Sequence, residues 1–241
     1  MSKEVDGLNV KEKKTWSDRK QDLKDKFKHY GNELKNKWQN NKKKILINYL
    51  IFVSIFLIFL IFDQVTKSLL FKWQDYENFK GDRTVLYVNA IFGIRSVEHH
   101  GVTILPWKGK TTVYIIQALS VIIFLALLAV PFLTDSKTMI IMFALIASGN
   151  VGNMLDRFMF SGHVKDIIFA SFLEKWQGRE LGTFNIADVS LVCGSIGLIL
   201  YFFIQLIAEY IDEQKEKNAL ATNQHSQQEN VESKPETKNE D

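Results

Sequence analysis

Apolar residues are concentrated in the middle of this chain, between two polar ends. Four runs there are long and apolar enough to cross a lipid bilayer as helices, and they cover residues 45–62, 111–134, 138–155 and 184–210. At about 1.5 Å of helical rise per residue, the first run is roughly 27 Å long, close to the thickness of the hydrocarbon layer. The pattern predicts an all-α polytopic membrane protein with four transmembrane helices.

The connection between the first two runs has a different pattern. Residues 83–97 are rich in Val, Ile, Tyr and Phe and follow the turn residues Gly81 and Asp82. Such a composition favours one or two short strands, with a bend near Gly93. We therefore expect a small β-rich segment outside the membrane.

Charge next to the first run predicts the orientation of the chain. Residues 1–44 contain 14 Lys and Arg against 7 Asp and Glu, whereas the whole chain has a net charge of only +3. Because basic residues stay on the cytoplasmic side, the N-terminus should be cytoplasmic. Four helices then place the C-terminus inside as well, and residues 63–110 and 156–183 outside.

The two polar ends of the chain differ in composition, and different structures are predicted for them. In the leader, residues 1–44, an apolar residue recurs every three to four positions among the lysines; the series is Leu23, Phe27, Tyr30, Leu34 and Trp38. This spacing predicts a basic amphipathic helix on anionic lipid. Its position directly before a membrane span favours lipid over nucleic acid, so no nucleic-acid partner is expected. The tail, residues 211–241, is polar and should be disordered, which leaves residues 45–210 as the membrane domain.

Polar side chains gather at the outer ends of the third and fourth runs. Asn153, Asp156 and Arg157 share one helical face, and Asn185 and Asp188 share another. A carboxylate at the edge of lipid is retained mostly where it faces a polar cavity, and two carboxylates make acid–base chemistry available. If the helix ends are neighbours, one pocket collects the following residues: Asn153, Asp156, Arg157, Asp166, Asn185 and Asp188.

These residues belong to four short motifs that occur in order between the four runs. They are Asp63-x-x-Thr66-Lys67, Gly152-Asn153-x-x-Asp156-Arg157, Gly162-His163-Val164-x-Asp166 and Phe184-Asn185-x-Ala187-Asp188. With these motifs the chain resembles the lipoprotein signal peptidases, also called signal peptidase II, an aspartic protease family of bacterial membranes. The resemblance covers about residues 45–210 and leaves both ends unexplained.

The resemblance implies a function and a set of site residues. It assigns Asp166 and Asp188 to the catalytic dyad, and a supporting polar shell to Asn153, Asp156, Arg157, Asn185, Asp63 and Lys67. The implied substrate is a prolipoprotein whose cysteine carries diacylglycerol, cleaved just before that cysteine at the extracytoplasmic face of the bacterial cell membrane. No metal or other cofactor is implied, and a monomer is expected.

Two positions depart from the family pattern. The family carries an Asn-x-Gly element after its outer strand, and the best counterpart here is His99-His100-Gly101. His99 would then stand in place of an asparagine that contacts substrate, with Gly101 beside it. Lys165 replaces an apolar residue before Asp166, and in an extended strand its side chain would point away from that aspartate.

Other interpretations compete with a peptidase. Either aspartate could cap a helix or extend to the membrane surface, although Asp188 lies later in its helix than a capping residue would. Asp63 and Lys67, four residues apart, could form a plain ion pair. The carboxylates could instead relay protons in a small transporter, or the chain could be an impaired relative that acts as a scaffold.

Metal chemistry finds little support in this sequence. No carboxylate–histidine helix spacing accompanies His99, His100 and His163. The single cysteine, Cys193, lies inside an apolar run, so neither a disulfide framework nor a cysteine-based metal site is available.

Overall fold

The computed structural model describes residues 15–72, 85–100 and 110–232, and contacts divide the chain into two units, Met1–Ile47 and Asn48–Asp241. In the first unit, helix α1 (Trp16–Leu70) begins after Thr15. Thr15 and Asp18 cap this start reciprocally, with N–H to oxygen distances of 2.9 and 3.3 Å. The backbone of α1 is non-helical at Asn41.

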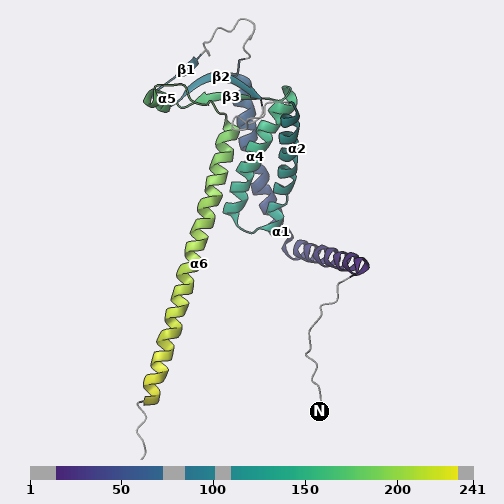
Figure 1. The fold of residues 1–241 in the computed structure, drawn as a ribbon, viewed down its shortest axis with the longest axis vertical. Helices are drawn as coiled ribbons and strands as arrows, with labels where there is room; N and C mark the ends of the chain where they lie inside the picture. Colours follow the sequence, from purple (N-terminus) through teal and green to yellow (C-terminus); the bar gives the residue numbers. More distant parts are fainter. Residues whose placement is uncertain (1–14, 73–84, 101–109, 233–241) are drawn as a thin grey trace, which may run out of the picture. The chain divides into compact units, whose positions relative to one another are not determined.

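The second unit is a bundle of membrane-length helices. The rest of α1 packs with α2 (Lys110–Leu127), α3 (Val130–Leu133) and α4 (Lys137–Met159), and α6 (Ile186–Glu232) runs beside α4 (Figure 1). Among the described residues, four helices are long and apolar enough to cross a membrane. The predicted all-α class with four membrane helices is confirmed.

Apolar side chains cover the outside of this bundle as well as its interior. The buried core contains Phe52, Leu127, Ile140, Ala144 and Ala147, contributed by α1, α2 and α4. Large apolar residues of the spans nevertheless face outward, among them Ile58, Ile122 and Phe203. In water such a surface would drive aggregation, whereas in a bilayer it faces lipid chains of the same polarity.

Small residues bring α4 and α6 into close contact. A Cβ atom added at Gly149 would lie 2.3 Å from the carbonyl oxygen of Ala187, and one added at Gly194 would lie 2.7 Å from that of Met142. Without side chains at these positions the two backbones can approach, as membrane helices often do. The contact fixes the position of α6 relative to α4 along the bundle axis, and therefore the position of Asp188 along that axis.

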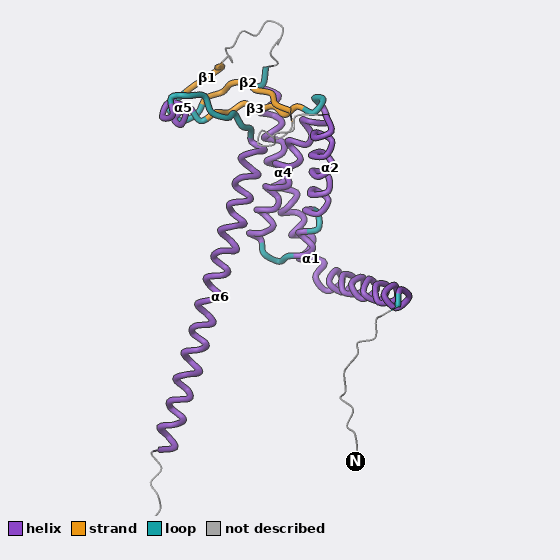
Figure 2. The backbone as a smooth tube through the Cα atoms, viewed as in Figure 1, coloured by secondary structure: helices purple, strands orange, loops and turns teal. Residues whose placement is uncertain are grey.

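A three-stranded antiparallel sheet lies across one end of the bundle (Figure 2), in the order β1 (Val85–Val88), β2 (Gly93–His100) and β3 (His163–Phe169). The predicted bend is present, because β2 starts at Gly93 after a turn in which Asn89 Oδ1 accepts the N–H groups of Ile91 and Phe92. The sequence did not predict that residues 163–169 form the third strand, nor that helix α5 (Ser171–Gln177) follows it.

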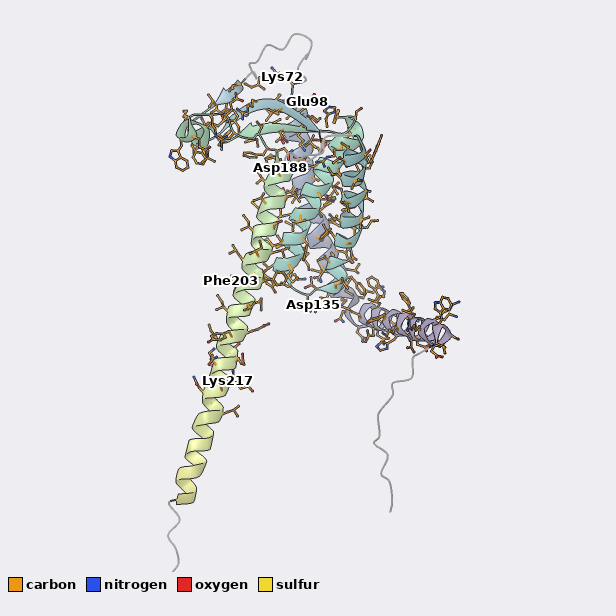
Figure 3. All side chains as sticks on the ribbon, in the orientation of Figure 1. Lys72, Glu98, Asp135, Asp188, Phe203 and Lys217 are labelled. Carbon is orange, nitrogen blue, oxygen red and sulfur yellow. The ribbon has the colours of Figure 1, made fainter. Side chains whose placement is uncertain are left out.

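The two ends of the bundle differ in chemistry. Asp188 lies at the end next to the sheet and Asp135 at the other end (Figure 3). Near Asp135, the buried Asn48 donates its side-chain amide to the carbonyl oxygens of Pro131 and Thr134, at 3.1 and 3.0 Å. These bonds hold the turn between α3 and α4 against α1.

Helix α6 continues beyond the last predicted span and ends at Glu232, inside the segment for which the sequence predicts disorder. Lys215 pairs with Asp212 at 3.1 Å and Lys217 with Glu213 at 2.7 Å, and all four side chains are exposed. Ion pairs three or four residues apart, together with good helix formers, favour helix without any packed core. Low hydrophobicity therefore signalled exposure here, not absence of structure.

The contact at Gly149 can be tested by adding one methyl group. Gly149→Ala should lower the stability of the detergent-solubilised protein by about 1–3 kcal/mol, because the Ala187 backbone cannot move without shifting α6. The measurement is the thermal unfolding midpoint. Gly31→Ala is the matched control, since this helical glycine has no atom within 4 Å of the added carbon; equal midpoints for the two variants would contradict the role of Gly149.

Candidate active site

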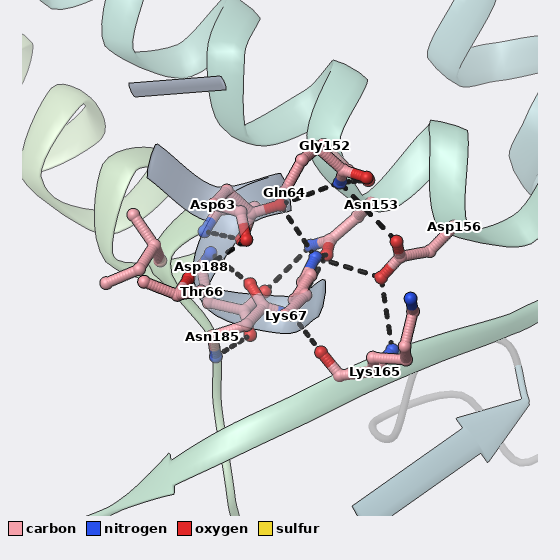
Figure 4. Close-up of polar contacts among 12 residues, drawn as sticks. Asp63, Gln64, Thr66, Lys67, Gly152, Asn153, Asp156, Lys165, Asn185 and Asp188 are labelled. Atoms are coloured by element: carbon pink, nitrogen blue, oxygen red, sulfur yellow. Dashed lines mark hydrogen bonds and ion pairs between the residues drawn. The ribbon is translucent and has the colours of Figure 1, made fainter. Parts of the chain in front are cut away.

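A buried lysine forms the centre of the polar cluster at the sheet end of the bundle. Lys67 Nζ lies 2.8 Å from Asp63 Oδ2, 2.9 Å from Asp156 Oδ2 and 3.2 Å from Asn153 Oδ1 (Figure 4). The side chains of Lys67, Asp63 and Asp156 are at most 1% exposed. A charge this deep is stable only when paired, so the lysine ties α1 to α4.

Gln64, which sequence reasoning did not single out, adds three contacts to this cluster. Its Nε2 lies 3.0 Å from Asp63 Oδ2, 3.3 Å from the carbonyl oxygen of Gly152 and 3.4 Å from Asp156 Oδ1. Gly152 leaves the space for them, because a Cβ there would lie 2.7 Å from Asp63 Oδ2. The available signal was a glutamine next to Asp63 at the polar end of the first span.

Asp63 also fixes where α6 begins. Its second oxygen, Oδ1, accepts the backbone N–H of Ala187 at 2.8 Å. The first N–H groups of a helix lack partners within the helix, and a carboxylate there is further stabilised by the helix dipole. Asp63 and Lys67 are therefore not an isolated ion pair at a helix end, since together they join α1, α4 and α6.

Asp188 takes part in the N-terminal cap of α6. Its Oδ2 accepts the backbone N–H of Asn185 at 3.1 Å, while Asn185 Oδ1 accepts the backbone N–H of Asp188 at 2.9 Å. This is the reciprocal pattern of a capping box. The expectation that Asp188 lies too late in the helix to cap it is wrong, because the third residue after the cap is the one that reaches back.

The side-chain amides of Asn185 and Asn153 connect the two candidate catalytic carboxylates. Asn185 Nδ2 lies 2.7 Å from Asp166 Oδ1, 3.0 Å from Asn153 Oδ1 and 3.2 Å from the carbonyl oxygen of Lys165. Asn153 Nδ2 in turn donates to Asp188 Oδ1 at 2.8 Å. Asp166 on β3 and Asp188 on α6 thus belong to one hydrogen-bonded network.

Arg157 supplies positive charge beside this network. Its Nη1 donates to the carbonyl oxygen of Asn153 at 3.3 Å, and its charge interacts with Asp188, Asp156 and Asp166. The sequence-predicted residues that the structure brings together are Asp63, Lys67, Asn153, Asp156, Arg157, Asp166, Asn185 and Asp188. Two carboxylates held by amide donors near one cation are suited to general acid–base chemistry.

Lys165 is held away from Asp166, as alternation along β3 predicts. Its ammonium lies 3.8 Å from the ring centre of Phe160 and 5.9 Å from that of Phe71. Burial lowers the pKa of Lys165 below its usual range, and the charge of Asp156 opposes that shift. Its backbone N–H meanwhile donates to Asp156 Oδ2 at 3.1 Å, so this residue supports the cluster through its main chain.

The histidines of the sheet lie on its paired strands β2 and β3, where the backbone of His100 lies opposite that of His163. The backbone of His99 lies in β2 opposite Val164, whereas Gly101 is outside the described residues. His163 Nδ1 lies 2.8 Å from the carbonyl oxygen of Phe160, and its Nε2 lies 3.9 Å from Glu98. Within residues 15–72, 85–100 and 110–232, no three His, Cys, Asp or Glu side chains form a metal-binding group.

A second buried cation, also missed by sequence reasoning, anchors the loop that leads to Asn185. Arg95 on β2 is paired with Glu174 of α5 through contacts of 2.7 and 3.2 Å. The same guanidinium donates to Thr183 Oγ1 at 2.9 Å and to the carbonyl oxygen of Leu181 at 2.6 Å. Its carbon centre lies 4.3 Å from the ring centre of Phe169. Arg95 thereby links the sheet to the start of α6.

The sequence of the membrane domain matches a known family of membrane enzymes. The family model described as signal peptidase (SPase) II matches residues 55–204. The chain belongs to the signal peptidase II family. Members are aspartic peptidases of the membrane, and the match leaves the leader and the C-terminal part of α6 outside the family region.

Relatives from several bacteria support the assignment to signal peptidase II. The lipoprotein signal peptidase of Borrelia turicatae is 30% identical over 179 residues, which cover 70% of this chain and 96% of that protein. The one from Pelodictyon phaeoclathratiforme is 29% identical over 160 residues, covering 63% of this chain and 89% of that protein. A Staphylococcus aureus lipoprotein signal peptidase is 30% identical over 158 residues, covering 66% and 90%.

Two solved structures of bacterial membrane enzymes have a fold similar to that of this chain. One is described as a bacterial membrane enzyme determined by the in meso method at 2.3 Å resolution. It is 25% identical with a TM-score of 0.52, covering 64% of this chain and 88% of that one. A second, at 1.9 Å, is 26% identical with a TM-score of 0.51, covering 63% and 91%. The chain is thus a multi-pass bacterial membrane protein.

The buried lysine makes a direct stability prediction. Lys67→Met should destabilise the protein by about 3–5 kcal/mol, because Asp63 and Asp156 would remain buried without their cation. Lys215→Met is the matched control, since this exposed lysine pairs with Asp212 on the surface and should cost at most about 1 kcal/mol. Thermal unfolding in detergent separates the two, and equal losses would show that burial of Lys67 has no energetic consequence.

Arg95 gives a second, independent test of the site. Arg95→Met should cost about 3 kcal/mol and speed amide hydrogen exchange in residues 178–185, because Glu174 loses its buried partner. Arg179→Met removes an exposed arginine from the same region, where it donates to Gln177, and serves as the control. Unchanged exchange in the Arg95 variant would mean that the loop is held by other contacts.

Proposed function

We propose that this signal peptidase II removes the signal peptide from diacylglyceryl-modified prolipoproteins, cleaving before the lipidated cysteine. The observation that carries the proposal is the amide of Asn185, which donates to Asp166 while the Asn185 backbone donates to Asp188. One residue thus holds both carboxylates of the proposed dyad. The names of the relatives, which are lipoprotein signal peptidases, support the substrate class.

The proposed reaction uses one ionised and one protonated carboxyl group. The ionised carboxylate takes a proton from water, whose oxygen forms a bond to the scissile carbonyl carbon as the other carboxyl donates its proton to the carbonyl oxygen. The tetrahedral intermediate then collapses, the C–N bond breaks, and the leaving nitrogen receives the proton taken from water. In this proposal one proton is shared by the two carboxyl groups and is not assigned to either residue.

Other members of the network orient the dyad. Asn153 donates to Asp188 and Asn185 donates to Asp166, and the positive charge of Arg157 interacts with both carboxylates. The Lys67 cluster would hold the network in place without contacting substrate.

The proposed topology puts this network at the outer face of the membrane. Both termini and the Asp135 turn would lie in the cytoplasm, and the sheet and Asp188 would lie outside. A lipid-modified substrate remains in the outer leaflet, so its cleavage site would meet the dyad at the level where the helices end. We propose that the chain acts as a monomer and that His99 and Gly101 contact the substrate.

A proton-coupled transporter is the alternative. It would need ionisable groups at several depths, whereas Asp63, Asp156 and Asp188 lie in one cluster at one end of the described bundle. That distribution favours the peptidase. Proton or solute flux in proteoliposomes that depends on Asp188, without proteolysis, would favour transport instead.

Amide substitutions test the dyad. Asp166→Asn and Asp188→Asn should each lower kcat for a diacylglyceryl prolipoprotein by at least about 10³-fold, because neither amide can exchange the required proton. Asp212→Asn, on the exposed part of α6, should leave the rate unchanged. Thermal midpoints report whether each variant stays folded; full activity in a folded dyad variant would defeat the assignment.

The departure at position 99 has its own test. If the chain is adapted to use His99, His99→Asn should change KM by several-fold while the chain remains active. If the chain is an impaired relative, the same substitution should raise kcat from a low level. Measuring both constants on one lipid-modified substrate distinguishes adaptation from impairment.

A further inference from the structure

The leader segment, residues 16–40 of α1, presents a narrow apolar stripe. At about 100° of rotation per residue, its six large apolar side chains fall within a sector of roughly 80°. They are Trp16, Leu23, Phe27, Tyr30, Leu34 and Trp38, and each is between 37% and 77% exposed. Exposed aromatic residues in a continuous row usually mark an interaction surface.

Charges are sorted around this stripe. The flanking positions on both sides are basic, and they include Arg19, Lys20, Lys24, Lys26, Lys35 and Lys37. The acidic residues lie farther round the helix, about 100–180° from the centre of the stripe, and they are Asp18, Asp22, Asp25 and Glu33. Glu33 pairs there with His29 at 3.2 Å. When the apolar stripe of such a helix lies on a surface, the basic side chains on both sides of the stripe also reach that surface.

Two lysines already lie against the aromatic residues at the ends of the stripe. Lys20 Nζ is 5.5 Å from the ring centre of Trp16, and Lys42 Nζ is 5.9 Å from that of Trp38. Membrane proteins often have tryptophan and lysine at the level of the lipid head groups. There the ring is partly buried in lipid while the amine remains in water.

We infer that the leader lies in the plane of the membrane surface, with its stripe among the lipid chains and its flanking lysines on anionic head groups. Charge complementarity favours anionic lipid as the binding surface. A neutral surface would contact the apolar stripe but would not pair with the basic residues beside it. Chain continuity favours the same surface, since a membrane span follows a few residues later. The proposed topology assigns this surface to the cytoplasmic leaflet, but the binding itself does not depend on the proposed cleavage.

Hydrogen exchange of the full-length protein in nanodiscs tests the inference. Nanodiscs of phosphatidylcholine alone are compared with nanodiscs that also contain phosphatidylglycerol. Amides of residues 16–40 should exchange several-fold more slowly with the anionic lipid, and high salt should remove the difference. Equal exchange in both lipids would overturn the inference. Protection that rises with the number of protein molecules per disc would also overturn it, because the stripe would then be a contact between copies.

Matched variants separate lipid binding from helix formation. Leu23→Ser with Phe27→Ser should abolish the protection, whereas Gln21→Ser with Asn36→Ser, on the opposite side, should retain it. Replacing Lys20, Lys24 and Lys35 by Gln should lower the ratio of bound to free leader by about fivefold per lysine. If both serine pairs behave alike, the protection reflects helix content and the inference fails.

The outcome is independent of the peptidase proposal. The Asp188→Asn chain should show the same lipid-dependent protection, and the leader variants should cleave substrate in detergent at the rate of the unaltered chain. Loss of protection in the dyad variant would connect the leader to the active site and contradict an independent membrane contact.

Discussion

The positions of the helices and of the sheet in this peptidase depend on the ion pairs of the Lys67 ammonium group with Asp63 and Asp156. This ammonium group pairs with two fully buried carboxylates, Asp63 and Asp156, and each of these carboxylates also binds a backbone N–H group of another element. Asp63 reaches Ala187 at the start of α6, while Asp156 reaches Lys165 on the strand that carries Asp166. A single buried cation therefore sets the relative positions of the two proposed catalytic groups. The cost of burying it is offset because every oxygen that faces it has a further structural role.

Close packing of the helices makes that arrangement possible. The glycines of α4 allow α6 to lie against it, and the missing side chain of Gly152 leaves room for Asp63. Polar groups from three helices can then converge without an intervening layer of apolar side chains. Arg95 performs a similar task outside the membrane, since it fastens the loop before α6 to the sheet. The two proposed catalytic aspartates thus lie between two buried cations, Lys67 and Arg95, each of which is paired with carboxylates.

Much of the fold and most of the site could be predicted from local sequence. Membrane spans are visible because lipid forces long apolar runs, and Asp188, Asn153 and Asn185 stood out as polar residues at the ends of such runs. Asp166 stood out through the motif that it shares with the lipoprotein signal peptidases. The contacts of Gln64 with α4 could not be predicted, since these partners lie 88 and 92 residues away. Arg95 was hidden for the same reason, and a short amphipathic segment gave no sign of α5. The helical continuation of α6 was missed because composition measures the lack of a core, not the lack of a helix.

The capping box of α6 adds a mechanical side to the proposed chemistry. Asp188 holds the first turn of its own helix through the backbone of Asn185, and Asn185 also grips Asp166. A proton that arrives on the capping oxygen would weaken this grip, and its departure would restore it. The hydrogen bond at the start of α6 would thus weaken and strengthen once in each catalytic cycle. The protonation state of Asp188 would then set how firmly the first turn of its own helix is held.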